Sequence, residues 1–245
     1  MTDQYADRAS YRALHNAADL TYYRVTLRQT DLHIGTKTDL RAQALKAVLA
    51  ARNQVEAAIS DRPRFGVSLE PLPPHGSETP LISGMLRAGQ AASVGPMAAV
   101  AGAIAEFTGR ALMPASPDGV VENGGDVFLW GDTPRTVAVF AGQSPLSGVL
   151  GVRVTPGDGL AVCTSSGTVG HSLSLGRADA AMIIARDAAL ADAAATMLGN
   201  LCTQPEAIEA ALNAAMAVPG VLGALVILGD KLGVRGQVEL TALSE

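Results

Sequence analysis

Aromatic and charged side chains are scarce in this sequence. Only 4% of its 245 residues are aromatic and 17% are charged, against about 25% charged residues in an average soluble domain. The formal net charge is −5, and lysine and arginine form no cluster along the chain. An acidic chain without a basic patch is a poor match for nucleic acid or for a membrane surface, so we expect neither partner. The low charge content also predicts that part of the surface is buried in a homo-oligomer.

Cysteine and long apolar runs are scarce as well. Cys163 and Cys202 are the two cysteines and have no CxxC spacing, so we expect buried free thiols in a reducing cytoplasm, with a disulfide as the alternative. The longest apolar run, 218–229, contains proline and glycine and is too short to span a bilayer. Residues 1–10 are polar and include two aspartates, which is not the pattern of a signal peptide and predicts a cytoplasmic protein.

Small aliphatic residues and glycine are abundant, and they favour helices packed closely on a sheet. Hydrophobic residues make up 48% of the chain, and 26 residues are glycine. Helical and strand patterns do not alternate as they do in a doubly wound sheet, so we expect an α+β fold. The patterns predict strands at 22–34, 119–121, 127–130, 136–140, 148–154, 160–163 and 181–185, helices at 39–59, 98–107, 188–198 and 206–216, and a terminal hairpin over 223–240.

The sequence also marks where the helices begin and end. Thr38 or Asp39 is expected to be the N-cap of the first helix, and Asp187 the N-cap of the helix at 188–198. Gly199 is expected to stop that helix. Residues 61–77 contain four prolines and predict a loop with at most one edge strand.

The first candidate site segment is Asn123-Gly124-Gly125-Asp126, between two strand patterns. Adjacent glycines permit positive φ angles, and their backbone N–H groups can form an anion-binding nest. The Asp126 carboxylate could then bind a ribose hydroxyl or a hydrated cation. The alternative is an ordinary β-turn with a solvated aspartate.

The second segment follows the strand pattern at 160–163 and is rich in hydroxyl groups and glycine. It comprises Thr164, Ser165, Ser166, Gly167 and Thr168, with His171 three residues later. Hydroxyls and flexible backbone donors suit a polyanion, and the histidine could hydrogen-bond a ligand. No GxSxG motif is present to indicate a serine nucleophile. A polar turn with a structural histidine is the alternative.

The third segment is an alanine-rich helix that carries Asp192 and Thr196. Because these residues are four apart, a helix places the carboxylate and the hydroxyl on one face. Such oxygen ligands suit magnesium, which takes one or two carboxylates and keeps waters or substrate phosphates. The alternative is a plain helix in which the threonine hydroxyl bonds back to the preceding turn.

The order and spacing of the three segments resemble the ApbE superfamily, whose characterised members are magnesium-dependent FAD:protein FMN transferases. In that family a GGD segment, a TSG segment followed by histidine, and an ADAxxT helix occur in this order. Here they are 124–126, 164–167 with His171, and 191–193 with Thr196. The resemblance implies one ApbE-like domain over 1–245, with 1–16 as a loosely held segment.

The resemblance also implies roles for individual residues. Asp192, Thr196 and the backbone carbonyl of Ala98 would bind magnesium, and Asp192 and His171 are the implied catalytic residues. The GGD and TSSG segments would face FAD or FMN. The implied function is a magnesium-assisted transferase or hydrolase that acts on a phosphate-bearing small molecule.

The chain departs from the flavin transferases at one motif. Where those enzymes carry Gly-Gly-x-Ala-Lys-Gly, this chain reads GPMAAV, with Ala99 at the lysine position and Val100 at the following glycine. It therefore looks more like a short cytoplasmic ApbE-like branch for which no reaction is established. The departure favours a second hypothesis, a non-catalytic flavin or metabolite binder. A third hypothesis is a component of sulfur or homocysteine metabolism that uses Cys163.

Overall fold

The computed structural model describes residues 17–166 and 176–243, and every strand pairing within them is antiparallel. The main sheet has eight strands in the order β1-β2-β3-β4-β7-β8-β9-β10, and a second sheet has three in the order β11-β6-β5. The strands are β1 (Thr21–Leu27), β2 (Thr30–Thr36), β3 (Gly119–Asn123), β4 (Asp126–Gly131), β5 (Arg135–Ala138), β6 (Leu150–Val154), β7 (Gly157–Ser165), β8 (Ala180–Ala185), β9 (Val221–Leu228), β10 (Lys231–Gly236) and β11 (Glu239–Ala242).

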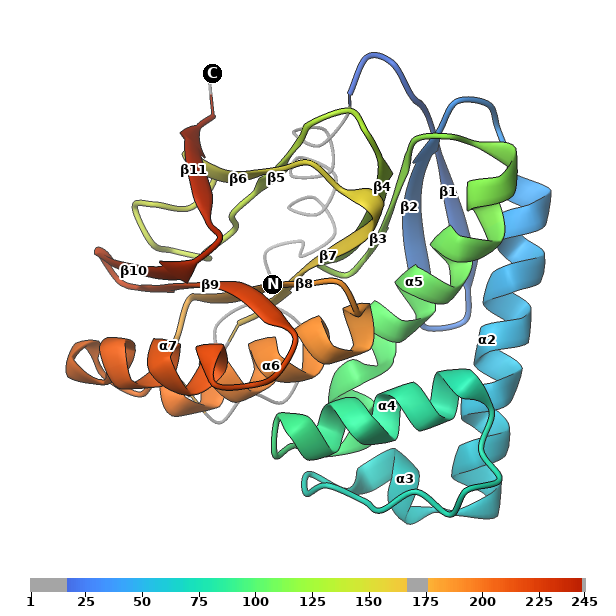
Figure 1. Ribbon diagram of the computed structural model, residues 1–245, viewed down its shortest axis with the longest axis horizontal. Helices are drawn as coiled ribbons and strands as arrows, with labels where there is room; N and C mark the ends of the chain where they lie inside the picture. Colours follow the sequence, from blue (N-terminus) through green and yellow to red (C-terminus); the bar gives the residue numbers. More distant parts are fainter. Residues whose placement is uncertain (1–16, 167–175, 244–245) are drawn as a thin grey trace, which may run out of the picture.

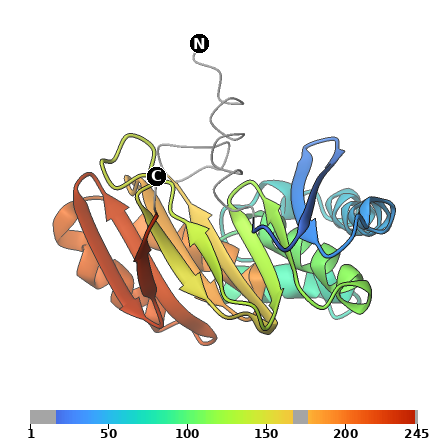
Figure 2. The ribbon, with the colours of Figure 1, turned by 90° about the horizontal axis from the view of Figure 1, so that it is seen from above.

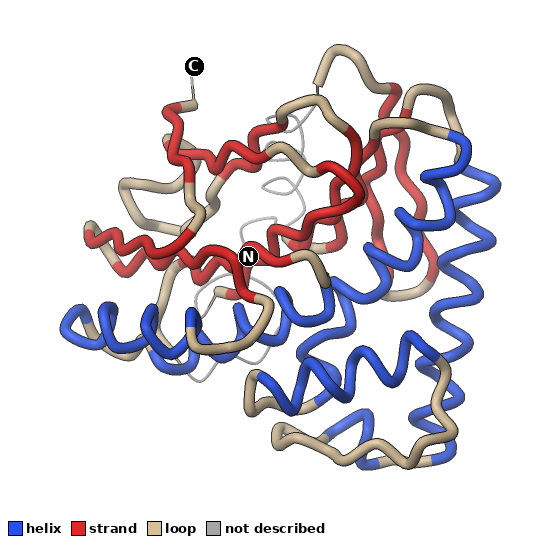
Figure 3. Tube along the Cα trace, viewed as in Figure 1, coloured by secondary structure: helices blue, strands red, loops and turns tan. Residues whose placement is uncertain are grey.

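The helices gather on one side of the main sheet (Figure 1, Figure 3). They are α2 (Arg41–Asp61), α3 (Arg64–Val67), α4 (Pro80–Ala91), α5 (Val100–Leu112), α6 (Ala188–Leu201) and α7 (Ile208–Met216), with short 3₁₀ turns η1 (Pro96–Ala99), η2 (Met113–Ala115) and η3 (Pro205–Ala207). The combination of antiparallel sheets and packed helices confirms the predicted α+β class.

The central strands are buried on both faces, because helices cover one face and the small sheet covers the other (Figure 2). In β4, Phe128 and Trp130 pack into the cluster on the helix side, whereas Val127 and Leu129 pack into the cluster against the small sheet. Alternate residues of a strand point to opposite faces. A strand that is covered twice is therefore apolar throughout, as β8 is.

Two expected elements are arranged differently in the structure. The single strand expected over 22–34 is a hairpin, in which Leu27 pairs with Thr30 across a two-residue turn. Arg28 takes a φ of +55° in this turn, a conformation usually marked by glycine or asparagine. No residue at this turn is typical of a turn, so the hairpin was not predicted. At the C-terminus, β10 ends at Gly236 and the next strand, β11, pairs with β6 in the small sheet.

The predicted helix ends are partly right. Asp187 is the N-cap of α6 and accepts a hydrogen bond from the Leu190 N–H. The prediction that α6 stops at Gly199 is wrong, because the helix continues to Leu201 and this glycine is buried where the chain near Gly176 approaches it. The first helix, α2, has Leu40 at the N-cap position, so the N-cap prediction there is wrong too.

Two helices were not predicted. The proline-rich stretch contains the short helix α3 rather than a strand, and α4 is a separate helix before α5 that the sequence patterns did not distinguish.

Both cysteines are buried free thiols, as predicted. Among the described residues, no single helix is long and apolar enough to cross a membrane. Within 17–166 and 176–243, one pair of helical segments, α4 with 96–115, passes such a test together, and this pair is bent by 110° at its break.

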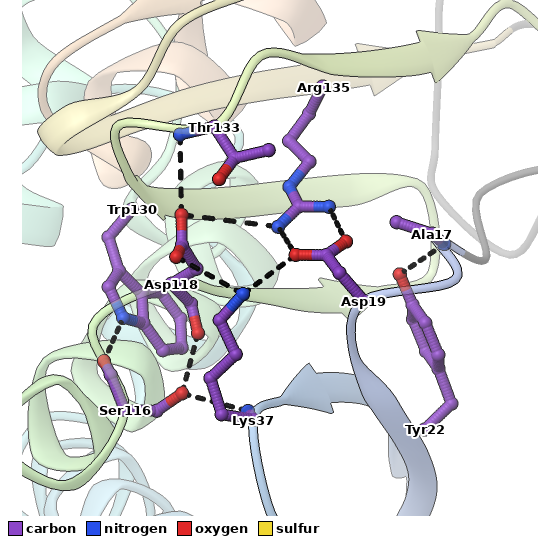
Figure 4. Close-up of polar contacts among 9 residues, drawn as sticks. All are labelled: Ala17, Asp19, Tyr22, Lys37, Ser116, Asp118, Trp130, Thr133 and Arg135. Atoms are coloured by element: carbon purple, nitrogen blue, oxygen red, sulfur yellow. Dashed lines mark hydrogen bonds and ion pairs between the residues drawn. The ribbon is translucent and has the colours of Figure 1, made fainter.

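A salt-bridge cluster fastens the chain before β1 to the start of β5 (Figure 4). The Arg135 guanidinium donates from Nη1 and Nη2 to the two carboxylate oxygens of Asp19, at 2.6 and 2.9 Å. Lys37 Nζ also donates to Asp19, at 2.7 Å, and pairs with Asp118 at 3.3 Å. Arg135 is 8% exposed, so its charge is poorly compensated without these carboxylates.

Asp19→Asn is expected to lower the free energy of unfolding by about 1–2 kcal/mol at pH 7, because it leaves the buried guanidinium without its main partner while solvent screens the exposed side of the pair. Hydrogen bonds from Arg135 and Lys37 hold the pKa of Asp19 well below its usual value. A lowered pKa stabilises the fold above the unfolded-state value of about 3.9, and this stabilisation is lost as the pH falls below it. Urea unfolding of the wild type and of Asp19→Asn at pH 7 and pH 3 measures this loss of stability. A deficit that stays the same at pH 3 would contradict it.

Candidate functional site

The first predicted segment forms the tight turn between β3 and β4. Asn123 pairs with Asp126, and the two glycines between them take φ angles of +68° and +107°. The turn lies beside the end of β7, because a Cβ atom placed on Gly125 would be 3.8 Å from the carbonyl oxygen of Thr164. The structure thus brings the first and second predicted segments together.

Hydrogen bonds within the protein already involve two groups of this turn. The N–H of Gly125 donates to the Glu122 carboxylate at 2.9 Å, so this donor is already used, and it faces a negative group. The side-chain amide of Asn123 donates to the carbonyl oxygen of Ala101 at 3.0 Å and ties the turn to the first residues of α5. The Gly125 N–H is therefore occupied by a neighbouring carboxylate in this structure, and anion binding by the turn stays a prediction.

Asp126 is buried rather than solvated. It is 6% exposed, and its Oδ1 atom has no hydrogen-bond partner within the described part of the chain. The pKa of Asp126 is raised well above its usual value, mainly by burial and next by the charge of the nearby Asp192 carboxylate. Hydrogen bonds from the Cys163 thiol and the Thr164 backbone lower this pKa and offset the rise only in part. The alternative of a solvated turn aspartate does not hold.

Asp192 lies on α6 with Thr196 one turn later, and both are partly exposed residues. Its Oδ2 atom accepts a hydrogen bond from the Gly102 N–H at 2.9 Å. Enclosure of the carboxyl group raises the pKa of Asp192 to about 7, although the N–H groups of Gly102 and Ala101 favour the charged form. The carboxylate is therefore fixed in position and poorly compensated.

Close contact between α5 and α6 sets the position of Asp192. A Cβ atom on Gly102 would collide with the carbonyl oxygen of Ala188 and would lie 2.9 Å from the Asp192 Cβ. Glu106, one turn further along α5, accepts a hydrogen bond from the Ala188 N–H at 2.7 Å. Neither Gly102 nor Glu106 is among the site residues predicted from sequence. The small residues of the helix pattern were the available signal for Gly102.

Cys163 lies next to the two aspartates but is not accessible. Cys163 is fully buried, and its thiol contacts the carbonyl oxygen of Ala188 at 3.7 Å. Burial and the Asp126 carboxylate raise the pKa of the thiol well above its usual value. Thiol nucleophiles need the opposite shift, so this geometry argues against a reactive cysteine.

The end of β7 carries the hydroxyl residues. Thr164 and Ser166 are partly exposed and Ser165 is buried. Gly167, Thr168 and His171 lie outside the described residues, so their roles stay predictions.

The motif that departs from the flavin transferases lies between α4 and α5. Ala98 is in η1, which packs against α6. Ala99 is fully buried in the core on the helix side, and Val100 begins α5. The lysine position is therefore a core position in this chain.

A cavity of about 580 Å³ lies at the opposite end of β4 and β7. Gly131 and Gly157 pair there, about 16 Å along the strand from Asp126 at the usual rise per residue. None of the predicted site residues that the structure describes lines it. Its lining residues are Arg110, Asp132, Gly157, Asp158, Gly159 and Arg186.

Comparison with known proteins decides the family. A family model described as AbpE bacteria matches residues 12–239. The chain belongs to this family. The UPF0280 protein of Methanothrix thermoacetophila is 43% identical over 198 residues, which cover 80% of this chain and 83% of that protein. The UPF0280 protein of Methanothermobacter thermautotrophicus is 38% identical over 232 residues, which cover 92% and 89%.

Solved structures share the fold of this AbpE family member at low sequence identity. The flavin transferase ApbE from Vibrio cholerae aligns with a TM-score of 0.61 and 13% identity, covering 90% of this chain and 97% of that chain. The flavinyl transferase ApbE from Pseudomonas stutzeri aligns with a TM-score of 0.57 and 13% identity, covering 89% and 94%. The resemblance to the ApbE superfamily and the predicted fold class are both confirmed.

Proposed function

We propose that this protein is a magnesium-assisted transferase or hydrolase that acts on a phosphate-bearing small molecule, with a flavin nucleotide as the favoured ligand. The observation that carries the proposal is the meeting of three segments far apart in sequence. The 124–125 turn lies beside Thr164, and Asp126 lies close enough to Asp192 for their charges to interact. A pair of charge-perturbed carboxylates, one of them on a buried residue, beside hydroxyl groups is typical of a functional site.

The residues present fit a magnesium ion. Asp192 and Thr196 offer a carboxylate and a hydroxyl from one helical face, and Ala98 offers a backbone carbonyl from a turn packed on that helix. Only one of these three ligands is a His, Cys, Asp or Glu side chain. The described ranges contain no group of three or more such side chains that could hold a metal, and the proposed set does not require one. Magnesium commonly accepts few protein ligands when substrate phosphates complete its shell.

The chain's own groups would hold and orient the ligand. The Gly102 N–H keeps the Asp192 carboxylate in one orientation. The hydroxyls of Thr164, near the end of β7, and of Ser166, directly after that strand, would donate hydrogen bonds to phosphate oxygens. A bound magnesium ion would neutralise phosphate charge, so that positioning and electrostatics supply most of the catalysis. His171 is the proposed proton carrier or ligand donor.

A second candidate is a non-catalytic binder of a flavin or another metabolite. The full burial of Ala99 favours it, because the chain carries no cation at the position where flavin transferases have lysine, and a cation beside a phosphate is a strong favourable contact. Purified protein that retains a stoichiometric ligand and shows no turnover would support the binder. Pyrophosphate cleavage would support the enzyme.

Magnesium and FAD together are expected to raise the melting temperature of the wild type, and Asp192→Asn is expected to abolish the rise. A ligand at about a hundred times its Kd adds about 2.7 kcal/mol, which for a chain of this size corresponds to several degrees at about 2–4 °C per kcal/mol. The measurement is a thermal-shift titration with FAD, FMN and ATP, each with and without magnesium.

Asp230→Asn is the matched control, because Asp230 is an exposed aspartate with a 73% accessible side chain. It should respond like the wild type. If Asp192→Asn kept the full magnesium-dependent shift, the proposed site would be wrong. If no flavin or nucleotide shifted the wild type, the proposed ligand class would be wrong.

A further inference from the structure

Asp126 has an unexplained oxygen. The residue is more than nine-tenths buried, and its Oδ1 atom has no hydrogen-bond partner among residues 17–166 and 176–243. Buried carboxylate oxygens without a partner are rare in folded proteins, because the lost hydration is not replaced. The other contacts of the carboxyl group, the Cys163 thiol and the Thr164 backbone, do not supply a positive charge.

The second carboxylate, Asp192, is close enough for its charge to act on Asp126, and among the described residues it also has no counter-charge. Asp192 accepts a hydrogen bond at Oδ2 from the Gly102 N–H, and neither aspartate forms an ion pair with a Lys, Arg or His side chain in the described part of the chain. Two adjacent, enclosed carboxylates repel each other unless a proton or a cation lies between them.

Rigid elements hold the two groups in place. Asp126 is the first residue of β4, directly after the glycine turn, and the Asn123 amide ties that turn to Ala101 in α5. The next residue of α5, Gly102, holds Asp192 on α6. The strand, the turn and both helices therefore fix the carboxylates relative to each other, as a built cation site requires.

We infer that Asp126 is a second carboxylate ligand of the cation bound by Asp192, and that it binds through its Oδ1 atom. The inference rests on the proposed function, since it concerns the same ion, and it assigns Asp126 to the metal rather than to the flavin. The site then has two carboxylates from two elements, which is within the usual number for magnesium.

The test measures binding of Mg²⁺ alone by calorimetry, and of Mn²⁺ alone by the loss of its free electron paramagnetic resonance signal. The variants are Asp126→Asn and Asp192→Asn, which preserve shape, and the exposed control Asp230→Asn. We expect Asp126→Asn to weaken binding of either ion at least tenfold, Asp192→Asn to abolish it, and Asp230→Asn to leave it unchanged. Circular dichroism and the melting temperature in EDTA show that each variant is folded.

The outcomes separate this inference from the proposed function. If Asp126→Asn bound the ions as the wild type does while Asp192→Asn did not, the metal site would stand and the role of Asp126 would be wrong. If the wild type and both variants failed to bind either ion, a proton rather than a cation would lie between the carboxylates, and both the inference and the magnesium proposal would be wrong.

Discussion

Replacing Asp192 with asparagine is expected to stabilise the metal-free protein by about 2–4 kcal/mol at pH 8, although it destroys the proposed site. The cause is the pKa of Asp192, which enclosure raises from 3.8 to about 7; each pKa unit corresponds to about 1.4 kcal/mol. The asparagine carbonyl oxygen can still accept the Gly102 hydrogen bond, so the variant loses the unfavourable charge and keeps the contact.

The sign follows from proton binding. Between pH 3.8 and about 7 the folded protein keeps the Asp192 proton that the unfolded chain releases, so the free energy of unfolding of the wild type falls as the pH rises and levels off above about 7. The asparagine variant lacks this fall. The gain should therefore be largest at pH 8 and below about 1 kcal/mol at pH 4.

Urea unfolding in EDTA at pH 4, 6 and 8 measures the effect, with Asp230→Asn as the exposed control. Functional sites often hold such unfavourable charges, and their removal stabilises the protein at the expense of activity. A loss of stability in Asp192→Asn at pH 8 would mean that a positive group compensates the carboxylate, and the proposed cation site would then be wrong.

Gly102→Ala is expected to lower the free energy of unfolding by about 1–3 kcal/mol, the usual cost of overpacking. The added Cβ would meet the carbonyl oxygen of Ala188, which belongs to a helix backbone and cannot move alone. α5 and α6 would have to separate, and the hydrogen bond from Gly102 to Asp192 would lengthen. We therefore expect the variant to lose magnesium binding as well.

Gly84→Ala is the matched control. Gly84 lies inside α4, and a Cβ added there meets no atom within 4 Å. Alanine in a helix interior is more favourable than glycine by about 0.5–1 kcal/mol, so this variant should be more stable than the wild type and bind magnesium normally. Equal effects of the two substitutions would show that the α5–α6 contact is not tight.

Local patterns predicted much of the fold. The strand at 181–185, the helix at 188–198 with Asp187 at its N-cap, and the terminal hairpin were all recognisable, because each depends on residues close together in the sequence. The hairpin of β1 and β2 was missed because Arg28 takes a positive φ angle without a glycine to mark it. The crossing of β11 to the small sheet was missed because pairing with β6 depends on residues about 90 positions away.

Part of the candidate site was also accessible from sequence. The i to i+4 spacing placed Asp192 and Thr196 on one helical face, and the paired glycines predicted a turn with positive φ angles. Burial of Asp126 was not predictable, because a GGD turn in isolation is solvated. Its environment is created by Cys163 of β7 and by α6, which the sequence does not place beside it.

The sequence by itself determined the α+β class, the family resemblance and the three chemical segments, since these depend on residue type, periodicity and order. Only the tertiary structure decided that Gly125 is already hydrogen-bonded, that Cys163 is inaccessible and that Asp126 and Asp192 lie close together. The physical reason is that charge, burial and hydrogen bonding depend on distances in space. The contact of α5 with α6, which Gly102 permits, sets those distances.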